Sequence, residues 1–414
     1  MEPFLNPFRP GAGQPPPYLA GRAKESNQFK ALLQQKPILK NLVITGLRGV
    51  GKTVLLESLK SEAVTSGWFW AGTDLSESAS VSEQNLSIRI LTDLSTLVSS
   101  FSIIEDEPSG IGFNQKPEKS ESKLTYTTLF SIYTVTPGLE TDKLKHVLEF
   151  IWNVVKIRVN GIVIAYDEAQ ILKDRAEDKQ YPLSLLLEVI QFMQRKEIPY
   201  LLVLTGLPTL VNTLSETRTY SERMFEIMTL NKLTDIETRE AILRPIQNQK
   251  CPVNFTEHGI NSIISHSSGY PYFIQFFCKE TFDSVLQQIN VGVEKPIVVI
   301  SEFVRKLDCD FYASRWSRVT DRQRELLVVI ARLPNANEEF TTKEISEKSF
   351  EILSNPFAPA YVVNSLIKLT TIGLIFKNRR GKYSFAVPLL ADYINRNISS
   401  EVVENDQWNW KLPG

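Results

Sequence analysis

Cysteine and histidine are scarce in this sequence, and long apolar runs are missing from it. Three cysteines and three histidines occur in 414 residues. The cysteines, Cys251, Cys278 and Cys309, lie far apart and form no C-x-x-C pair. This spacing argues against a disulfide framework or a zinc ribbon and predicts a reducing, cytoplasmic location. No apolar run approaches the roughly 20 residues of a membrane-spanning helix, so we expect no membrane partner.

The chain also lacks an excess of either charge. Its 46 basic and 47 acidic residues give a formal net charge of -1, which argues against a protein that coats nucleic acid with its whole surface. Any nucleic-acid binding must then come from a local basic patch. The length is too great for one ordinary hydrophobic core, and the 43% hydrophobic and 22% charged residues are typical of a globular protein, so we expect two or three domains.

One glycine-rich stretch indicates a specific chemistry. It has the form G-x-x-x-x-G-K-[ST] and lies between an apolar, strand-like run at 38–45 and a leucine-spaced helix. Its residues are Gly46, Leu47, Arg48, Gly49, Val50, Gly51, Lys52 and Thr53, and we expect these and the next residue, Val54, to bind the nucleotide. In this context the glycines let backbone N–H groups surround a polyphosphate, and the helix N-terminus adds the positive end of its dipole. We expect Lys52 to neutralise the β- and γ-phosphates of ATP and the Thr53 hydroxyl to bind Mg²⁺.

A second motif complements the first. The apolar run 161–166 ends in Asp167 and Glu168, which is the form of a Walker B strand. Carboxylates at the end of a buried strand need a compensating partner, because uncompensated buried charge is costly. We expect Asp167 to hold Mg²⁺ through its water shell and Glu168 to polarise the attacking water. The two motifs together predict an α/β P-loop NTPase fold with a parallel sheet.

The region before the phosphate loop resembles the AAA+ ATPases. Residues 7–17 are rich in proline and glycine and predict an extended arm, which is followed by Ala20, Gly21 and Arg22 and then by a helix. In AAA+ proteins an arm that ends in a Gly-Arg pair folds over the adenine. The resemblance therefore implies this role for Ala20, Gly21 and Arg22. A plain turn before a helix is the alternative.

The same resemblance implies two further roles. A buried strand at 200–204 ends in Thr205, where AAA+ proteins carry a polar sensor beside the γ-phosphate. Arg223 occupies the place of the arginine finger, which meets the nucleotide of a neighbouring subunit with its planar fork of donors. This implies a homo-oligomer or a partner protein that completes the site. An exposed arginine paired with a local carboxylate is the alternative for Arg223.

The region after residue 231 begins with a predicted helical lid. A capping box at 234–237 opens it, and Ser268-Gly269-Tyr270-Pro271 resembles the Gly-x-Pro lid motif of the STAND branch and of replication initiators. The resemblance places Pro271 beside the nucleotide. Many AAA+ lids carry an arginine near this point, whereas this sequence has Pro271 and Tyr272, which predicts slow hydrolysis.

A winged helix is expected after the lid. Three helical patterns, the last at 359–369, precede an alternating hairpin at 373–387. Residues 311–397 contain 13 Lys or Arg and 8 Asp or Glu. The predicted wing tip holds Lys377, Arg379, Arg380 and Lys382, which we expect to contact DNA phosphates. A protein-docking module is the alternative.

Together these features predict four segments. They are a nucleotide-binding core with its arm at 1–231, a helical lid at 232–296, a winged helix at 297–397 and a tail at 398–414. The polar run 103–123 has too little apolar content to pack, so we expect an exposed loop there. The resemblance implies a slow, Mg²⁺-dependent ATPase that acts as a switch and couples ATP to DNA binding in replication, transposition or defence. A STAND-like signalling or scaffold ATPase with a protein partner is the alternative.

Overall fold

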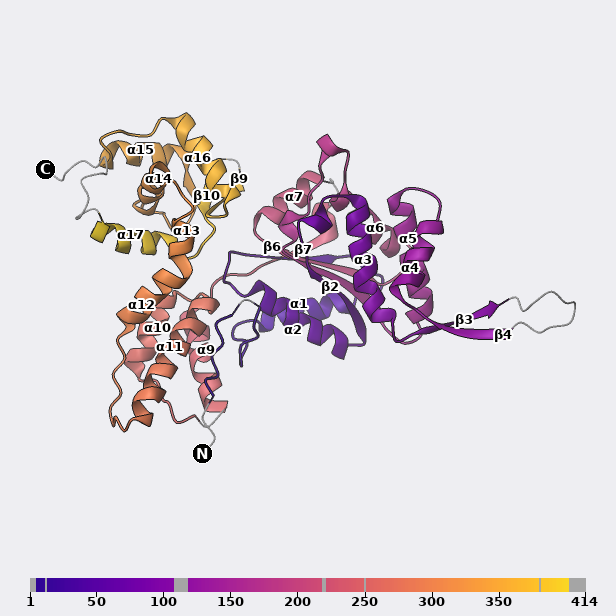
Figure 1. The fold of residues 1–414 in the computed structure, drawn as a ribbon, viewed down its shortest axis with the longest axis horizontal. Helices are drawn as coiled ribbons and strands as arrows, with labels where there is room; N and C mark the ends of the chain where they lie inside the picture. Colours follow the sequence, from indigo (N-terminus) through magenta and orange to yellow (C-terminus); the bar gives the residue numbers. More distant parts are fainter. Residues whose placement is uncertain are drawn as a thin grey trace, which may run out of the picture. The chain divides into compact units, whose positions relative to one another are not determined.

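The computed structural model of this chain consists of two compact units (Figure 1). It describes residues 5–11, 13–107, 118–217, 221–248, 251–379 and 381–401. We call Arg22–Gly46 together with Lys52–Leu230 the sheet unit. We call Met1–Gly21, Leu47–Gly51 and Asn231–Gly414 the C-terminal unit. The middle of the phosphate loop therefore groups with the C-terminal unit, while both of its flanks belong to the sheet unit.

The sheet unit is built around five parallel strands in the order β2-β5-β6-β1-β7. The strands are β1 (Asn41–Thr45), β2 (Trp68–Asp74), β5 (Gly161–Asp167), β6 (Tyr200–Gly206) and β7 (Phe225–Thr229). Every residue of β1, β5 and β6 is buried. Continuous apolar runs of this kind suit a parallel sheet that is covered on both faces. The predicted α/β fold with a parallel sheet is confirmed.

Helices cover both faces of this sheet (Figure 1). They are α1 (Ala23–Leu33), α2 (Lys52–Thr65), α3 (Glu83–Val98), α4 (Tyr126–Val135), α5 (Glu140–Val155), α6 (Pro182–Arg195), α7 (Thr209–Thr217) and α8 (Ser221–Met224), with short turns η1 (Ser78–Ser80), η2 (Ala169–Ile171) and η3 (Ala176–Asp178). Helices α1 and α2 lie on one face, and α3, α5 and α6 lie on the other. One hydrophobic core joins the second group of helices to the sheet.

The prediction of an exposed loop at 103–123 is wrong for both ends of this segment, which form strands. Strands β3 (Ser102–Glu107) and β4 (Glu118–Lys123) pair in an antiparallel ladder, with Asp106 opposite Lys119. Low apolar content correctly argues against a core, but a two-stranded ladder satisfies its backbone hydrogen bonds without one. The middle of the predicted loop, at 108–117, lies outside the described residues.

The C-terminal unit is mainly helical. Its helices are α9 (Asp235–Asn248), α10 (Glu257–Ser267), α11 (Pro271–Asn290), α12 (Ile300–Leu307), α13 (Ser314–Trp316), α14 (Asp321–Ala331), α15 (Thr342–Ile352), α16 (Pro359–Thr371) and α17 (Leu390–Glu401), with a π-helical turn η4 (Asp308–Ala313). A small antiparallel sheet in the order β8-β10-β9 consists of β8 (Phe340–Thr341), β9 (Ile375–Arg379) and β10 (Lys382–Phe385). Helix α17 continues to Glu401, and residues 402–414 of the predicted tail lie outside the described residues.

The N-terminal arm packs on α11 within the C-terminal unit. Phe8 is 2% exposed and lies in the same core as Phe282. The Asn6 amide donates to the carboxylate of Asp283 at 2.7 Å and to the carbonyl of Lys279 at 3.1 Å. The arm is therefore held by both apolar and polar contacts. Of the described helices, none is both long and apolar enough to cross a membrane.

Candidate nucleotide site

The phosphate loop has the backbone geometry that its glycines predict. Gly49 and Gly51 have φ angles of 78° and 90°, which side chains with a Cβ rarely adopt. Helix α2 begins directly after the loop, at Lys52. The Lys52 side chain is buried, and its Nζ donates to the carbonyl of Gly46 at 3.0 Å. The Gly46 carbonyl therefore holds the ammonium group that is expected to bind the phosphates.

The register of the sheet brings the second motif to the same edge as the loop. Ile44, near the end of β1, lies opposite Thr205 of β6. Tyr166, near the end of β5, lies opposite Leu204 of β6. Because the three strands are parallel, Asp167 and Thr205 lie at the edge where β1 ends and the phosphate loop begins.

Thr53 and Asp167 meet directly at this edge. The Thr53 hydroxyl donates to Oδ2 of Asp167 at 2.5 Å, and the backbone N–H of Glu168 donates to Oδ1 at 2.8 Å. Burial raises the pKa of the Asp167 carboxyl, and the negative charges of Glu168 and Asp74 raise it further, while the two hydrogen bonds act in the opposite direction.

This donor set fits Mg²⁺ bound together with phosphate. Mg²⁺ prefers oxygen ligands and in such sites takes one or two carboxylates plus phosphate oxygens and water. A hydroxyl and a carboxylate in contact supply the protein's share of such a shell. No cluster of three or more His, Cys, Asp or Glu side chains suited to a metal occurs among the described residues, so Thr53 and Asp167 would hold the ion only with the help of a phosphate ligand.

Glu168 follows Asp167 in a strained, exposed position. Its φ of 52° places it in the left-handed region, which is costly for a residue with a Cβ and is frequent at functional sites. The amide nitrogen of Gln170 donates to its carboxylate. The amide oxygen of Gln170 accepts from the backbone N–H of Leu207 at 3.0 Å. Gln170 therefore links Glu168 to the end of β6.

Sequence reasoning did not single out Gln170. A Cβ on Gly206 would lie 2.6 Å from its amide oxygen, so the glycine after Thr205 makes room for this link. The sequence offered two signs of this link: a polar residue two places after Glu168 and a glycine at the end of another strand. Neither sign points to Gln170 until β5 and β6 are known to be neighbours.

Thr205 has a buried hydroxyl. The residue is 0% exposed, and its Oγ1 has no hydrogen-bond partner among the described residues. A buried hydroxyl without a partner costs free energy unless a water or a ligand satisfies it. The placement is compatible with the predicted sensor role, which stays a prediction.

The residues predicted to cover the adenine divide between the two units. Ala20 is 5% exposed and lies in the core of the C-terminal unit, and Gly21 has a φ of 67°. A Cβ on Gly21 would lie 2.6 Å from the carboxyl carbon of Glu237, so a larger residue there would displace that side chain. Arg22, in the sheet unit, is 7% exposed and pairs with Glu25 at 3.4 Å. Their contact with a nucleotide stays a prediction.

The predicted lid residue Pro271 lies next to the phosphate loop within the C-terminal unit. It is the first residue of α11, and its Cγ lies 3.9 Å from the position that a Cβ on Gly51 would take. The backbone N–H of Tyr272 donates to the carbonyl of Gly49 at 3.4 Å. The start of α11 therefore contacts the loop that is expected to bind the phosphates.

Arg223 lies at the opposite edge of the sheet from these groups. It belongs to α8, directly before β7, whose first residue lies opposite Asn41 at the start of β1. The Nζ of Lys40 donates to the Arg223 carbonyl at 2.7 Å. The length of β1 separates the two edges by about 16 Å at roughly 3.3 Å per residue. The structure therefore does not bring Arg223 together with Lys52 and Asp167 of the same chain.

The predicted wing tip is described only in part. Lys377 is exposed on β9, and Lys382 is half-buried at the start of β10. Arg379 lies opposite Lys382 in the ladder. Arg380 lies outside the described residues. Contact of these four residues with DNA stays a prediction.

Comparison with known proteins agrees with this geometry for the sheet unit. Residues 18–207 match the family model of the AAA ATPase domain. The fold is that of an AAA P-loop NTPase. Residues 310–394 match a domain of unknown function, DUF8462. No curated protein matches the sequence of the chain.

Solved structures share the fold of residues 18–207 and of the region that follows them. The Walker-type ATPase PABY2304 of Pyrococcus abyssi aligns with a TM-score of 0.57 at 15% identity, covering 91% of this chain and 96% of that one. The ADP form of the Aeropyrum pernix ORC2 protein aligns with a TM-score of 0.56 at 14% identity, covering 96% and 100%. Its ADPNP–ADP complexes align with a TM-score of 0.53 at 13% identity, covering 95% and 98%. At these identities the likeness concerns the fold alone.

Proposed function

We propose that this chain is a Mg²⁺-dependent ATPase that hydrolyses ATP slowly and acts as a molecular switch. The observation that carries the proposal is the 2.5 Å contact between Thr53 and Asp167 beside the buried Lys52. It joins a hydroxyl, a carboxylate and a cation at the end of a parallel strand, where this fold places its glycine-rich loop. The match to the AAA ATPase domain and the ADP and ADPNP complexes of the ORC2 relative support nucleotide as the ligand.

Each residue of the site has a distinct task in this proposal. Lys52 and the backbone N–H groups of the loop bind the phosphates, while Thr53 and Asp167 hold Mg²⁺. Mg²⁺ held there would neutralise charge on the phosphates in the reaction of ATP and water to ADP and phosphate. Glu168 orients the attacking water and accepts its proton, and Gln170 holds the Glu168 carboxylate in place.

The neighbouring subunit has a task as well. Arg223 lies too far from Lys52 of its own chain to act there, so it would stabilise the phosphates bound by another copy or by a partner protein. Its guanidinium forms no hydrogen bond or ion pair within the described residues, which leaves it available for such a contact.

The output of the switch is proposed to be DNA binding by the C-terminal unit. Three helices, α14, α15 and α16, accompany the small sheet β8-β10-β9, as a winged helix requires. The hairpin of β9 and β10 carries Lys377 and Lys382, which would contact backbone phosphates. This role would suit replication, transposition or defence.

One observation favours protein docking as a second candidate output. Helix α16, which would enter the DNA groove, exposes Val363 by 40% and Ile367 by 56%, and Phe350 of α15 is 61% exposed. Helices that read bases present side chains that form hydrogen bonds to base edges. Exposed apolar side chains of this kind are more typical of protein interfaces.

Replacement of Lys52 tests the nucleotide assignment. We expect Lys52→Ala to weaken equilibrium ATP binding at least tenfold, because hydrogen bonds to a charged group contribute about 1.5–3 kcal/mol. The matched control is Lys60→Ala, which removes an exposed lysine from the same helix α2 and should bind ATP as the wild type does. Isothermal titration calorimetry measures both, with circular dichroism to check folding. Unchanged ATP affinity in folded Lys52→Ala would contradict the proposal.

A further inference from the structure

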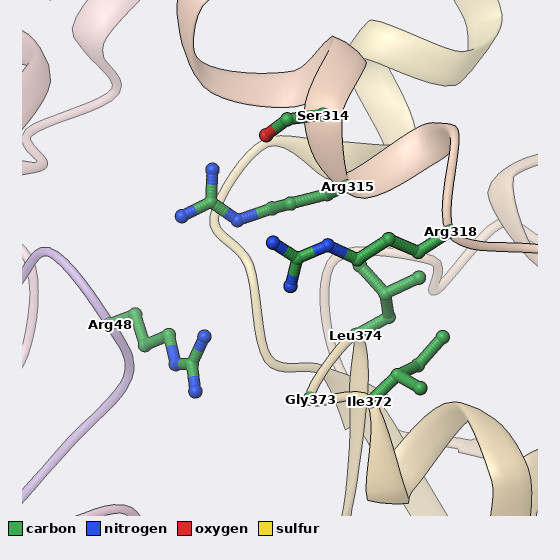
Figure 2. Close-up of a pocket in the computed structure, with 7 residues that line it drawn as sticks. All are labelled: Arg48, Ser314, Arg315, Arg318, Ile372, Gly373 and Leu374. Atoms are coloured by element: carbon green, nitrogen blue, oxygen red, sulfur yellow. The ribbon is translucent and has the colours of Figure 1, made fainter.

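A small cavity in the C-terminal unit is lined by three arginines. It has a volume of about 140 Å³, and Arg48, Arg315 and Arg318 contribute guanidinium groups to its wall. Figure 2 shows Arg48 reaching in from the phosphate loop on one side, with Arg315 and Arg318 extending from the opposite side. Gly373 and Leu374 form part of the remaining wall.

The three guanidinium groups of this cavity carry like charges. Within the described part of the chain, none of the three guanidiniums forms an ion pair with a carboxylate. Burial lowers the pKa of Arg315, and the charges of Arg48 and Arg318 lower it further. Three like charges that converge without a counter-charge repel one another, so an anion between them would lower the free energy of the folded protein.

The Arg315 guanidinium is held in position by its surroundings. The Arg315 guanidinium stacks over the ring of Phe311 at 4.1 Å, and its Nη1 donates to the Phe311 carbonyl. Gly373 has a φ of 74°, and a Cβ there would lie 3.3 Å from Nη2 of Arg48. The glycine thus leaves room for Arg48 to approach the wall. Groups that are already positioned lose little conformational entropy when a ligand binds.

The size and the chemistry of the cavity indicate its ligand. At roughly 30 Å³ for each water, the cavity holds about five waters, which is room for one tetrahedral oxyanion but not for a nucleoside. Guanidinium groups bind phosphate oxygens through paired hydrogen bonds, and arginine is the residue of choice for such sites. We propose that this arginine pocket binds one phosphate group. The pocket shares Arg48 with the phosphate loop but contains neither Lys52 nor Asp167, so the proposal does not rest on the proposed ATPase activity.

Titration with inorganic phosphate tests the pocket. The full chain is first saturated with a non-hydrolysable ATP analogue and Mg²⁺, so that the γ-phosphate position of the nucleotide site is filled as well, and phosphate binding is then measured by calorimetry. We expect the double variant Arg315→Gln/Arg318→Gln to bind phosphate at least tenfold more weakly, because it removes two positive charges and their charge-assisted hydrogen bonds to the anion. The control Arg305→Gln removes an exposed arginine of α12 and should leave phosphate affinity unchanged.

Two results would overturn the proposal: no phosphate binding by the wild type, or equal affinity in the double variant. If the double variant fails to fold, Arg48→Gln replaces an exposed side chain and should also lose at least tenfold. Phosphate binding to Lys52→Ala can also be measured in the absence of nucleotide. Binding by this variant tests the arginine pocket without relying on the proposed ATPase site, so a failure of one proposal can be told from a failure of the other.

A short DNA duplex distinguishes the two sources of a phosphate group. If the duplex displaces phosphate and binds at least tenfold more weakly to Arg315→Gln/Arg318→Gln, the pocket takes a backbone phosphate of nucleic acid. If the duplex leaves phosphate binding unchanged, the pocket takes the free anion.

Discussion

At the scale of single residues, Asp167 shows how two opposing effects act on one carboxylate. It is 3% exposed, which disfavours its charged form, yet it accepts hydrogen bonds from the Thr53 hydroxyl and the Glu168 N–H. Burial is the largest effect, so the pKa of Asp167 is raised above its ordinary value of 3.8. A bound Mg²⁺ would place a positive charge beside the carboxylate and so favour its charged form.

The raised pKa predicts how the nucleotide-free protein responds to pH. Between the ordinary value of 3.8 and the raised value, the folded protein binds more protons than the unfolded chain, so the free energy of unfolding falls as pH rises through this window. Asp167→Asn cannot ionise at this position, so it removes this loss of unfolding free energy. We expect the variant to melt at a higher temperature than the wild type at pH 7, and the difference to shrink towards pH 4. Thermal melts without nucleotide between pH 4 and pH 8 measure it; a variant that melts lower at pH 7 would contradict the prediction.

At the scale of elements, the turn between β1 and α2 depends on its glycines. Gly51 has a φ of 90°, and no atom crowds the position of a Cβ there more closely than Pro271 at 3.9 Å. The strain of a substitution would therefore come from the backbone angle and not from a clash.

This strain predicts a loss of both stability and ATP affinity in Gly51→Ala. A non-glycine residue in this conformation costs about 1–3 kcal/mol, so urea denaturation should show a loss of that size. The control is Gly292→Ala, which has a φ of 85° and open space around it, far from the loop in sequence. It should lose similar stability and bind ATP as the wild type does. Wild-type ATP affinity in Gly51→Ala would mean that the turn does not shape the site.

Helix starts were well predicted from the sequence because capping is local. The capping box at Thr234 and Glu237 is present, with the Thr234 N–H donating to the Glu237 carboxylate at 2.8 Å. Helix α15 also opens with a capping box, formed by Thr341 and Glu344. The hairpin of β3 and β4 was missed, because its strands lack the alternating apolar pattern that predicts a half-buried strand.

At the scale of the whole molecule, the position of Arg223 distinguishes an active site within one chain from an active site shared by two chains. Arg223 precedes β7 at the edge where β1 begins, whereas the phosphate loop follows the end of β1. In the proposed mechanism a complete site would therefore need two chains, one that supplies Lys52 and Glu168 and one that supplies Arg223.

Mixing experiments test this arrangement. We expect Arg223→Ala and Glu168→Gln to lose turnover when each is assayed alone, the second by about 10²–10⁴-fold, which is typical for the loss of a general base. A mixture should recover part of the turnover, because some sites combine an intact Glu168 with an intact Arg223. Arg195→Ala, at an exposed position of α6, should behave as the wild type. A mixture no more active than its components would argue against a shared site.

The salt dependence of DNA binding distinguishes the two proposed outputs. Each phosphate contact contributes about 0.9 to the slope of log affinity against log salt for duplex DNA. We therefore expect Lys377→Gln/Lys382→Gln to bind more weakly and with a shallower slope. The control Lys343→Gln, 83% exposed on α15, should change neither. No binding at low salt, or binding untouched by the double variant, favours a protein partner.

The sequence by itself determined the local parts of this protein. Spacing of glycines, a lysine and a threonine defines the phosphate loop, and buried runs that end in Asp167 and Thr205 define strand ends, because backbone conformation and burial follow from neighbouring residues. Only the tertiary structure decided which residues far apart in the sequence contact one another. Thr53 and Asp167 are 114 positions apart, and they meet because β6 pairs with both β1 and β5. The arginine pocket likewise joins Arg48 to residues after 313, since long-range packing, unlike periodicity, leaves no signature in a short stretch of sequence.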